Sequence, residues 1–163
     1  MGSGQLTPAV EVRPATTADA ALLLSWANDP DTRAASFHPA RIEPGEHAAW
    51  LARTLTLPTR RLLIGMLDGQ PIGQVRLDAI GPGQAEVGIS VDPDRRGLGL
   101  GSQLLAAGLE AGRRDREFGV ERFVARVRVG NEASMRLFEH AGFILRETGT
   151  CEGVPCIVYE LPA

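Results

Sequence analysis

The chain has 163 residues, with 17 Lys or Arg, 20 Asp or Glu and a formal net charge of -3. This length is typical of one domain with a sizeable hydrophobic core, so we expect a single domain over residues 1–163. The slightly acidic balance argues against a nucleic-acid-binding face. No apolar run reaches the roughly 20 residues that span a membrane, and the first residues do not resemble a secretory signal. We therefore expect a cytoplasmic protein with neither a nucleic acid nor a membrane as partner.

Hydrophobic periodicity in the first 91 residues predicts helices and strands in a regular order. Thr17 is the expected N-cap of the first helix, and Pro44 is the expected first-turn residue of a later one. Asp68-Gly69 is typical of a two-residue hairpin turn. The expected elements are a strand over 10–13, a helix over 17–26, a short irregular or helical piece over 31–39, a helix over 44–55 and three strands over 61–67, 71–79 and 85–91.

The second half of the chain alternates helices with strands. Asn131 is the expected start of one helix, and Gly142 is its expected left-handed end. The predicted elements are helices over 99–115 and 131–141 and strands over 123–129, 143–147 and 154–161. This order predicts a mixed sheet with helices on its faces and one crossover helix between parallel strands.

Two cysteines, Cys151 and Cys156, lie near the C-terminus. Two cysteines do not make a disulfide framework, and their spacing is not that of a zinc site. We therefore expect two unpaired structural thiols and no bound metal.

A glycine-rich, doubly basic loop follows the strand that ends at Val91. Glycines stand at positions 97, 99 and 101, after Arg95 and Arg96, and a helix begins directly behind them. Backbone N–H groups and a helix N-terminus bind phosphate groups in such loops. The loop lacks the Lys-Ser/Thr end of a P-loop, and its glycine spacing differs from the dinucleotide-binding fingerprint. The sequence therefore predicts a site for a small molecule that carries a pyrophosphate.

The motif Arg96-Gly97-Leu98-Gly99-Leu100-Gly101 resembles the Arg/Gln-x-x-Gly-x-Gly/Ala signature of the GNAT superfamily of acyl-CoA N-acyltransferases. Residues 86–93 are similar to that family's preceding strand. The spacing Asn131-x-x-Ser134-x-x-Leu137-Phe138-x-x-x-Gly142-Phe143 resembles its second signature. The resemblance implies an α/β (α+β) GNAT fold: a central mixed, mostly antiparallel twisted sheet of six or seven strands, flanked by about four helices.

The resemblance also implies acetyl-CoA as the cofactor. The glycine loop and the following helix would hold the pyrophosphate through backbone N–H groups. The backbone of Ile89 and Val91 would pair with the pantetheine arm like an added strand, at a place where the family's sheet splays apart. The implied cofactor-binding residues are Ile89, Val91, Arg96, Gly97, Leu98, Gly99, Gly101, Ser102, Asn131, Ser134 and Phe138.

The implied reaction is direct transfer of an acetyl group to a primary amine, which must lose a proton to attack. Glu86 is the candidate base, and a solvent-exposed strand glutamate is the alternative. A backbone N–H near Ser90 and Val91 would stabilise the developing oxyanion. Many family members carry a tyrosine acid where this chain has Phe138, and the only tyrosine is Tyr159. The sequence leaves open which group protonates the departing thiolate.

The acceptor region is expected in the N-terminal helices, with Trp26, Arg33, Phe37 and His47 as candidate contacts. The segment around Trp26 resembles members that acetylate nucleotide-linked amino sugars, and we favour such an acceptor. Protein N-termini are the alternative, followed by polyamines and antibiotics. A non-catalytic acyl-CoA-binding module also stays open, since a fold does not guarantee chemistry. The partner is expected to be a small amine, and the protein a monomer or homodimer; the acyl-chain preference is left open.

Overall fold

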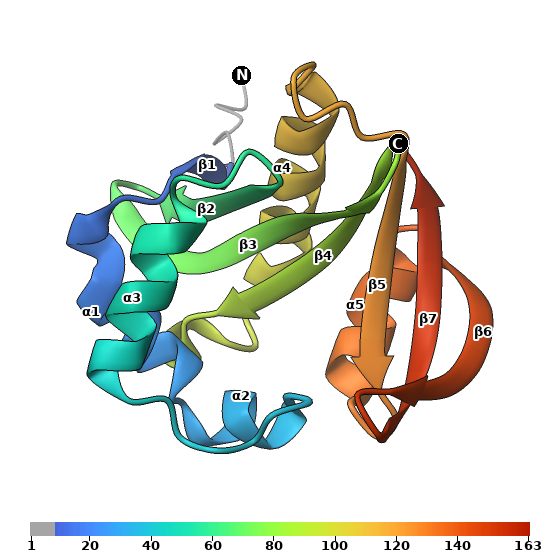
Figure 1. The fold of residues 1–163 in the computed structure, drawn as a ribbon, viewed down its shortest axis with the longest axis horizontal. Coiled ribbons are helices and arrows are strands. Elements are labelled where there is room, and N and C mark those ends of the chain that lie inside the picture. The colour runs from blue at the N-terminus through green and yellow to red at the C-terminus, as the bar shows by residue number, and fades with distance from the viewer. Residues whose placement is uncertain (1–8) are drawn as a thin grey trace, which may run out of the picture.

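The computed structural model describes residues 9–163, which form a seven-stranded sheet in the order β1-β2-β3-β4-β5-β7-β6. Five neighbouring pairs run antiparallel, and β4 and β5 run parallel. The mixed, mostly antiparallel sheet is therefore confirmed (Figure 1). The strands are β1 Glu11–Pro14, β2 Arg60–Leu67, β3 Gln70–Gly81, β4 Gln84–Val91, β5 Arg122–Arg128, β6 Ile144–Cys151 and β7 Val154–Pro162.

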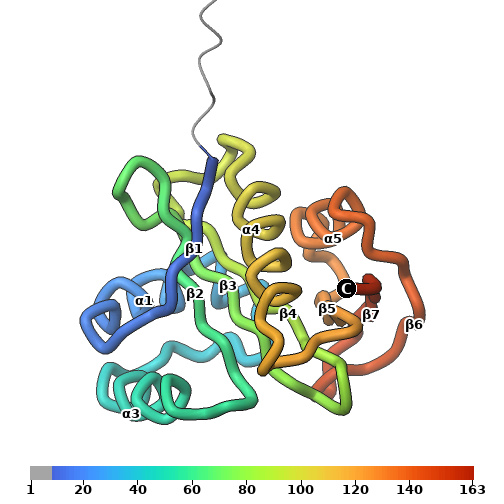
Figure 2. Tube along the Cα trace, turned by 90° about the horizontal axis from the view of Figure 1, so that it is seen from above, coloured from blue at the N-terminus to red at the C-terminus, as the bar shows by residue number. Residues whose placement is uncertain are grey.

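Helices cover both faces of the sheet. The crossover helix α4 packs on β1 and β3, whereas α1 and α3 pack on each other and on β2 from the other side (Figure 2). The α-helices are α1 Ala20–Ala27, α2 Pro30–Ala35, α3 Pro44–Thr54, α4 Leu100–Arg114 and α5 Glu132–His140, with short 3-10 turns at η1 Thr17–Asp19 and η2 Pro93–Arg95. Residues 9–163 form one α-helix more than the expected four, because the segment predicted to be irregular or helical forms the short helix α2. Asp29 caps α2 by accepting a hydrogen bond from the Thr32 amide at 3.0 Å.

Two local predictions about helix ends have different outcomes. The predicted cap Thr17 is wrong, because the capping residue is Thr16, whose backbone N–H donates to the Asp19 carboxylate at 2.8 Å. At α5, the predicted cap Asn131 is confirmed and accepts from the Ser134 amide at 3.3 Å. Gly142 ends this helix with a φ of +94°, as predicted.

The sheet opens between its two parallel strands. β4 and β5 pair only from Gln84↔Arg122 to Glu86↔Val124, and both strands then continue without each other. In Figure 1 they converge near the C-terminus and separate toward α2. The gap between them runs from Glu86, where the two strands part, to the glycine loop. We call the point at which the strands part the fork. The fork and the glycine loop therefore lie at opposite ends of one opening.

The expectation of unpaired thiols is wrong, because Cys151 and Cys156 form a disulfide. Cys151 lies opposite Val154 in the β6–β7 hairpin, and Cys156 is two residues further along the same face. Side chains in this diagonal arrangement are within reach of each other. The count of cysteines could not indicate this contact, since it depends on the register of the hairpin.

Candidate active site

A cleft of about 970 Å³ occupies the opening of the sheet and extends beneath α3. Its walls come from the glycine loop, β4, β5 and α5, and from the segment around α2. The cleft therefore joins the predicted phosphate loop to the predicted acceptor region in one continuous space.

The edge of β4 that faces β5 offers unpaired backbone groups to this cleft. The Asp92 amide donates to the Ile72 carbonyl of β3 at 2.8 Å. In an antiparallel pair the residues that bond to the neighbour alternate, so Ser90 and Gly88 also face β3, and Ile89 and Val91 face away. Because β5 has already diverged at these positions, the N–H and C=O groups of Ile89 and Val91 point into the opening. An extended ligand can pair with this edge as an added strand.

The glycine loop presents the N-terminus of α4 at the open end. Gly97 and Gly99 have φ values of +77° and +74°, which the absence of a Cβ permits. No atom lies within 4 Å of the position that a Cβ would take on either residue. The first amides of α4 have no partner within the helix. Open space above such amides is the arrangement that suits a phosphate group.

The predicted loop residues do not all face the cleft in the same way. The guanidinium of Arg96 donates to Asp29 at 2.8 Å and to the Thr32 hydroxyl at 3.0 Å. Burial opposes ionisation of Asp29, but the hydrogen bonds from Arg96 and Thr32 outweigh it and lower its pKa. Leu98 and Ser102 are exposed and lie outside the cleft lining. Arg96 thus connects the glycine loop to the N-terminus of α2.

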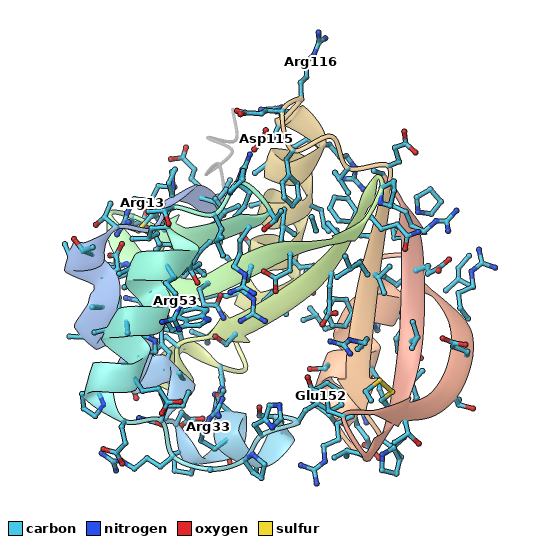
Figure 3. All side chains as sticks on the ribbon, in the orientation of Figure 1. Arg13, Arg33, Arg53, Asp115, Arg116 and Glu152 are labelled. Carbon is cyan, nitrogen blue, oxygen red and sulfur yellow. A yellow bond between two sulfur atoms is a disulfide. The ribbon has the colours of Figure 1, made fainter. Side chains whose placement is uncertain are left out.

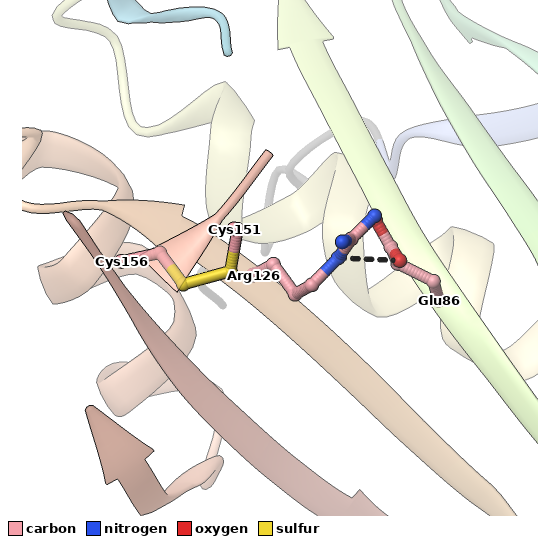
Figure 4. Close-up of a disulfide and its surroundings, with 4 residues drawn as sticks. All are labelled: Glu86, Arg126, Cys151 and Cys156. Atoms are coloured by element: carbon pink, nitrogen blue, oxygen red, sulfur yellow. Dashed lines mark hydrogen bonds and ion pairs between the residues drawn. A yellow bond between two sulfur atoms is a disulfide. The ribbon is translucent and has the colours of Figure 1, made fainter. Parts of the chain in front are cut away.

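Glu86 lies at the fork, where the two strands part. Both of its carboxylate oxygens accept from Arg126 of β5, at 2.8 and 3.0 Å (Figure 4). The pairing raises the pKa of Arg126. The ion pair bridges the strands beyond their last backbone contact and orients the carboxylate. Figure 4 also draws the Cys151–Cys156 disulfide next to the Arg126 side chain.

Further along β4, Ser90 accepts from the Gln74 side-chain amide at 3.0 Å. The Gln74 carbonyl oxygen is buried and has no partner among the described residues.

On the other wall, the predicted residues Asn131, at the start of α5, and Ser134 and Phe138, within α5, all line the cleft. These residues face Ser90 and Gln74 across the part of the cleft that lies between the fork and the glycine loop.

The one tyrosine lies away from this cleft. Tyr159 is fully buried, and its hydroxyl donates to Glu139 at 2.9 Å. Burial and this hydrogen bond raise the pKa of Tyr159 to about 12. Tyr159 therefore does not replace the proton donor that is missing at Phe138.

A segment that we call the α2 strap, residues 29–43, lines the cleft where the acceptor contacts are predicted. Arg128 of β5 donates to the carbonyls of Ala34 and Ser36 at 3.0 and 3.1 Å. His38 lies 2.6 Å from Glu152 at the tip of the β6–β7 hairpin, beside the strap in Figure 3. The strap thus spans from the first half of the sheet to the second.

The predicted acceptor contacts have different positions. Phe37 and His47 line the cleft. Burial lowers the pKa of His47, so its imidazole is neutral near pH 7. Arg33 also lines the cleft, but it donates to backbone carbonyls in and next to the strap. Trp26, in contrast, is buried in the core beside α3 and is not among the residues that line the cleft.

Sequence reasoning missed Arg126, Arg128 and Gln74 as cleft residues. The alternation of apolar residues with Arg126 and Arg128 in β5 indicated a shared face. It could not indicate that this face borders the opening.

The open sheet and the glycine loop define the class of acetyltransferase domains. The family model described as acetyltransferase (GNAT) domain matches residues 10–144. The chain therefore belongs to the GNAT acetyltransferase family.

Individual relatives agree with this class. Mycothiol acetyltransferase from Nocardiopsis dassonvillei is 34% identical over 91 residues, which are 56% of this chain and 23% of that protein. The chain thus spans about a quarter of the length of this curated relative. An aminoglycoside acetyltransferase in complex with coenzyme A and kanamycin superposes with a TM-score of 0.82 at 24% identity over 94% of both chains. Spermidine N-acetyltransferase from Vibrio cholerae, in complex with coenzyme A and spermine, gives 0.82 at 16% identity over 94% of this chain and 95% of that chain. These two likenesses concern the fold.

Two further findings concern metal binding and membrane insertion. The described residues contain no group of three or more side chains that could hold a metal ion. No helix among them is long and apolar enough to cross a membrane.

Proposed function

We propose that this chain transfers an acetyl group from acetyl-CoA directly to a primary amine. The observation that carries the proposal is the unpaired edge of β4 at Ile89 and Val91, which leads to the open amides of the glycine loop. The free edge of β4 suits an extended arm that pairs with it as an added strand, and the glycine loop suits a pyrophosphate. The solved structures with coenzyme A or acetyl-CoA that share this fold support the same cofactor.

Acetyl-CoA supplies the acetyl group as an activated thioester. The amides at the start of α4, with Gly97 and Gly99, would hold the pyrophosphate, and Asn131 and Ser134, which line the cleft, would flank the arm. An amide near Ser90 and Val91 would stabilise the negative charge that develops on the thioester oxygen during acyl transfer. The strap and α3 enclose the amine.

Glu86 accepts the proton of the attacking amine, either directly or through water. Its carboxylate lies at the fork of the cleft, and the two hydrogen bonds from Arg126 hold it in place. His47 is another group in this cleft that can accept a proton, since its imidazole is neutral. Phe138 and the buried Tyr159 leave proton delivery to the thiolate without a tyrosine.

The test is a free-thiol assay with acetyl-CoA and a panel of amines that includes amino sugars, nucleotide-linked amino sugars, short peptides, polyamines and aminoglycosides. Thiol release that depends on one class of amine is the expected result. Calorimetric binding of coenzyme A is measured in parallel. Binding without thiol release from any amine would contradict acetyl transfer and favour a non-catalytic acyl-CoA-binding module.

A further inference from the structure

The acceptor end of the cleft carries an excess of positive charge. The arginines that line it come from α2, α3, β3 and β5, and they are Arg33, Arg53, Arg76, Arg126 and Arg128. The acidic residues in the lining are Glu46, Glu86 and Asp31, the last of which is exposed and lies 3.5 Å from Arg96. A polycationic amine would meet repulsion here, because like charges in a partly buried site raise the free energy of binding.

Three of the five arginines, Arg33, Arg126 and Arg128, use their terminal guanidinium nitrogens or their charge in contacts within the protein. Arg33 and Arg128 donate to backbone carbonyls of the strap and its neighbours, and neither has a carboxylate partner among the described residues. Both therefore keep their full positive charge beside the cleft. Arg126 is paired with Glu86. Arg53 and Arg76 remain as the arginines that can contact a ligand.

Arg76 offers an unused guanidinium fork. Its Nε donates to Asp78 at 2.8 Å, but Asp78 also lies 2.7 Å from Arg60, so one carboxylate serves two guanidinium groups. No residue in the described range 9–163 accepts a hydrogen bond from the two terminal nitrogens of Arg76. Four N–H donors in one plane match the oxygens of a carboxylate or phosphate.

The place of Arg76 on the floor of the cleft favours contact with an acceptor. Arg76 pairs with Gly88 across β3 and β4, between the register pairs that contain Glu86 and Ser90. One terminal nitrogen lies 3.7 Å from the position that a Cβ would take on Gly88. The guanidinium also lies 5.9 Å from the centre of the Trp50 ring. The fork therefore lies over the strand that carries the candidate catalytic residues.

Arg53 adds a second charge from above. It follows Trp50 by three residues on α3, and residues at this spacing share one face of a helix. No carboxylate among residues 9–163 is within ion-pair distance of Arg53. His47, three residues before Trp50, is neutral near pH 7 and does not offset this charge.

We infer that the acceptor is a primary amine that also carries an anionic oxygen group, a carboxylate or a phosphate, which binds the fork of Arg76 with support from the charge of Arg53. This inference rests on the proposed acetyl transfer and names the class of its acceptor. It disfavours polyamines and aminoglycosides for this chain.

The first experiment measures kcat/KM in the thiol-release assay with amines matched in all but charge. Glucosamine 6-phosphate is compared with glucosamine, and β-alanine with its amide, while spermidine and kanamycin represent polycations. We expect at least a tenfold preference for the anionic member of one pair, and the pair that shows it separates phosphate from carboxylate. A preference for the neutral members or for a polycation would overturn the inference and leave acetyl transfer intact.

The second experiment measures binding of the anionic amine to the protein saturated with coenzyme A, which carries no acetyl group to transfer. Arg76→Gln is expected to raise the Kd about 10- to 100-fold. Arg76→Lys, which keeps the charge but loses the fork, is expected to have an intermediate effect. Arg114→Gln removes one charge near the far end of α4 and is the matched control, with an unchanged Kd. Thermal unfolding and coenzyme A affinity check that each variant is folded.

Failure of the proposed acetyl transfer and failure of the anion site at Arg76 give different results. Arg76-dependent binding without any thiol release from acetyl-CoA would contradict the proposed function and leave the anion site supported. Equal binding by the wild type and Arg76→Gln would overturn the anion site, whatever the activity.

Discussion

The glycine loop allows a test in which the protein and the ligand impose different requirements on one residue. Gly99 has a φ of +74°, and a Cβ there would meet no atom of the described residues within 4 Å. A valine at this position therefore clashes with none of residues 9–163, but its left-handed backbone costs about 1–2 kcal/mol. Gly69, in the β2–β3 hairpin and outside the cleft lining, has a matching φ of +76° and the same open space at its Cβ position.

We therefore expect Gly99→Val to lower Tm by about 2–8 °C, since 1 kcal/mol corresponds to about 2–4 °C in a chain of this size. Its branched side chain also fills the open space that the proposal assigns to the pyrophosphate, so coenzyme A affinity should fall at least tenfold. Gly69→Val is the control: it should lower Tm for the same backbone reason and leave coenzyme A affinity within about twofold of wild type, since Gly69 lies outside the cleft. Calorimetric titration and thermal unfolding measure the two effects.

The outcome for affinity decides the assignment of the loop. If Gly99→Val bound coenzyme A as tightly as the wild type, the pyrophosphate would not lie against this loop. A lower Tm with unchanged affinity would leave the backbone argument standing and refute the ligand argument alone.

Three further predictions concern the carboxylate, the buried histidine and the disulfide. Glu86→Gln is expected to lower kcat about 100-fold and to change the pH–rate profile, because general bases contribute at least that much; an unchanged profile would remove Glu86 from the mechanism. Burial lowers the pKa of His47, so the unfolded state binds a proton at a higher pH than the folded state does. The folded state therefore has its full stability above about pH 6.5, the ordinary histidine pKa, and loses part of it as the pH falls through the pKa of the folded state. Urea unfolding at several pH values should show this decline in the wild type and not in His47→Gln, and a decline of equal size in the variant would contradict it. Replacing Cys151 and Cys156 by serine together should cost about 2 kcal/mol of stability; a Tm equal to that of the wild type under oxidising conditions would show that the disulfide contributes no stability.

Local signals in the sequence predicted most elements of the fold. Asn131 and Gly142 bound α5 as predicted, because a side-chain cap and a left-handed glycine act within one turn of the chain. Thr17 failed as a cap because Asp19, held by Arg13 at 2.8 Å, selects the amide of Thr16 instead. That choice depends on a contact between the first strand and the first helix, which no local pattern expresses.

The candidate site divides in the same way. The position of the glycine loop after a strand and before a helix could be predicted, and so could the position of Glu86 on β4. The partners of these residues could not be predicted. Arg96 bonds to Asp29 across 67 positions, and Arg126 bonds to Glu86 across 40.

The sequence by itself determined the order of elements, the phosphate-binding character of the loop and the resemblance to the GNAT family, since each depends on residues close together in the chain. Only the tertiary structure decided that Trp26 is a core residue and that the cysteines are joined. It also decided that the cleft gathers arginines from four elements. Trp26 packs against α3 and β2, the cysteines meet through the register of the β6–β7 hairpin, and the arginines share one cleft because β4 and β5 separate. None of these contacts is expressed in a local sequence pattern, since each depends on how separate elements pack or pair.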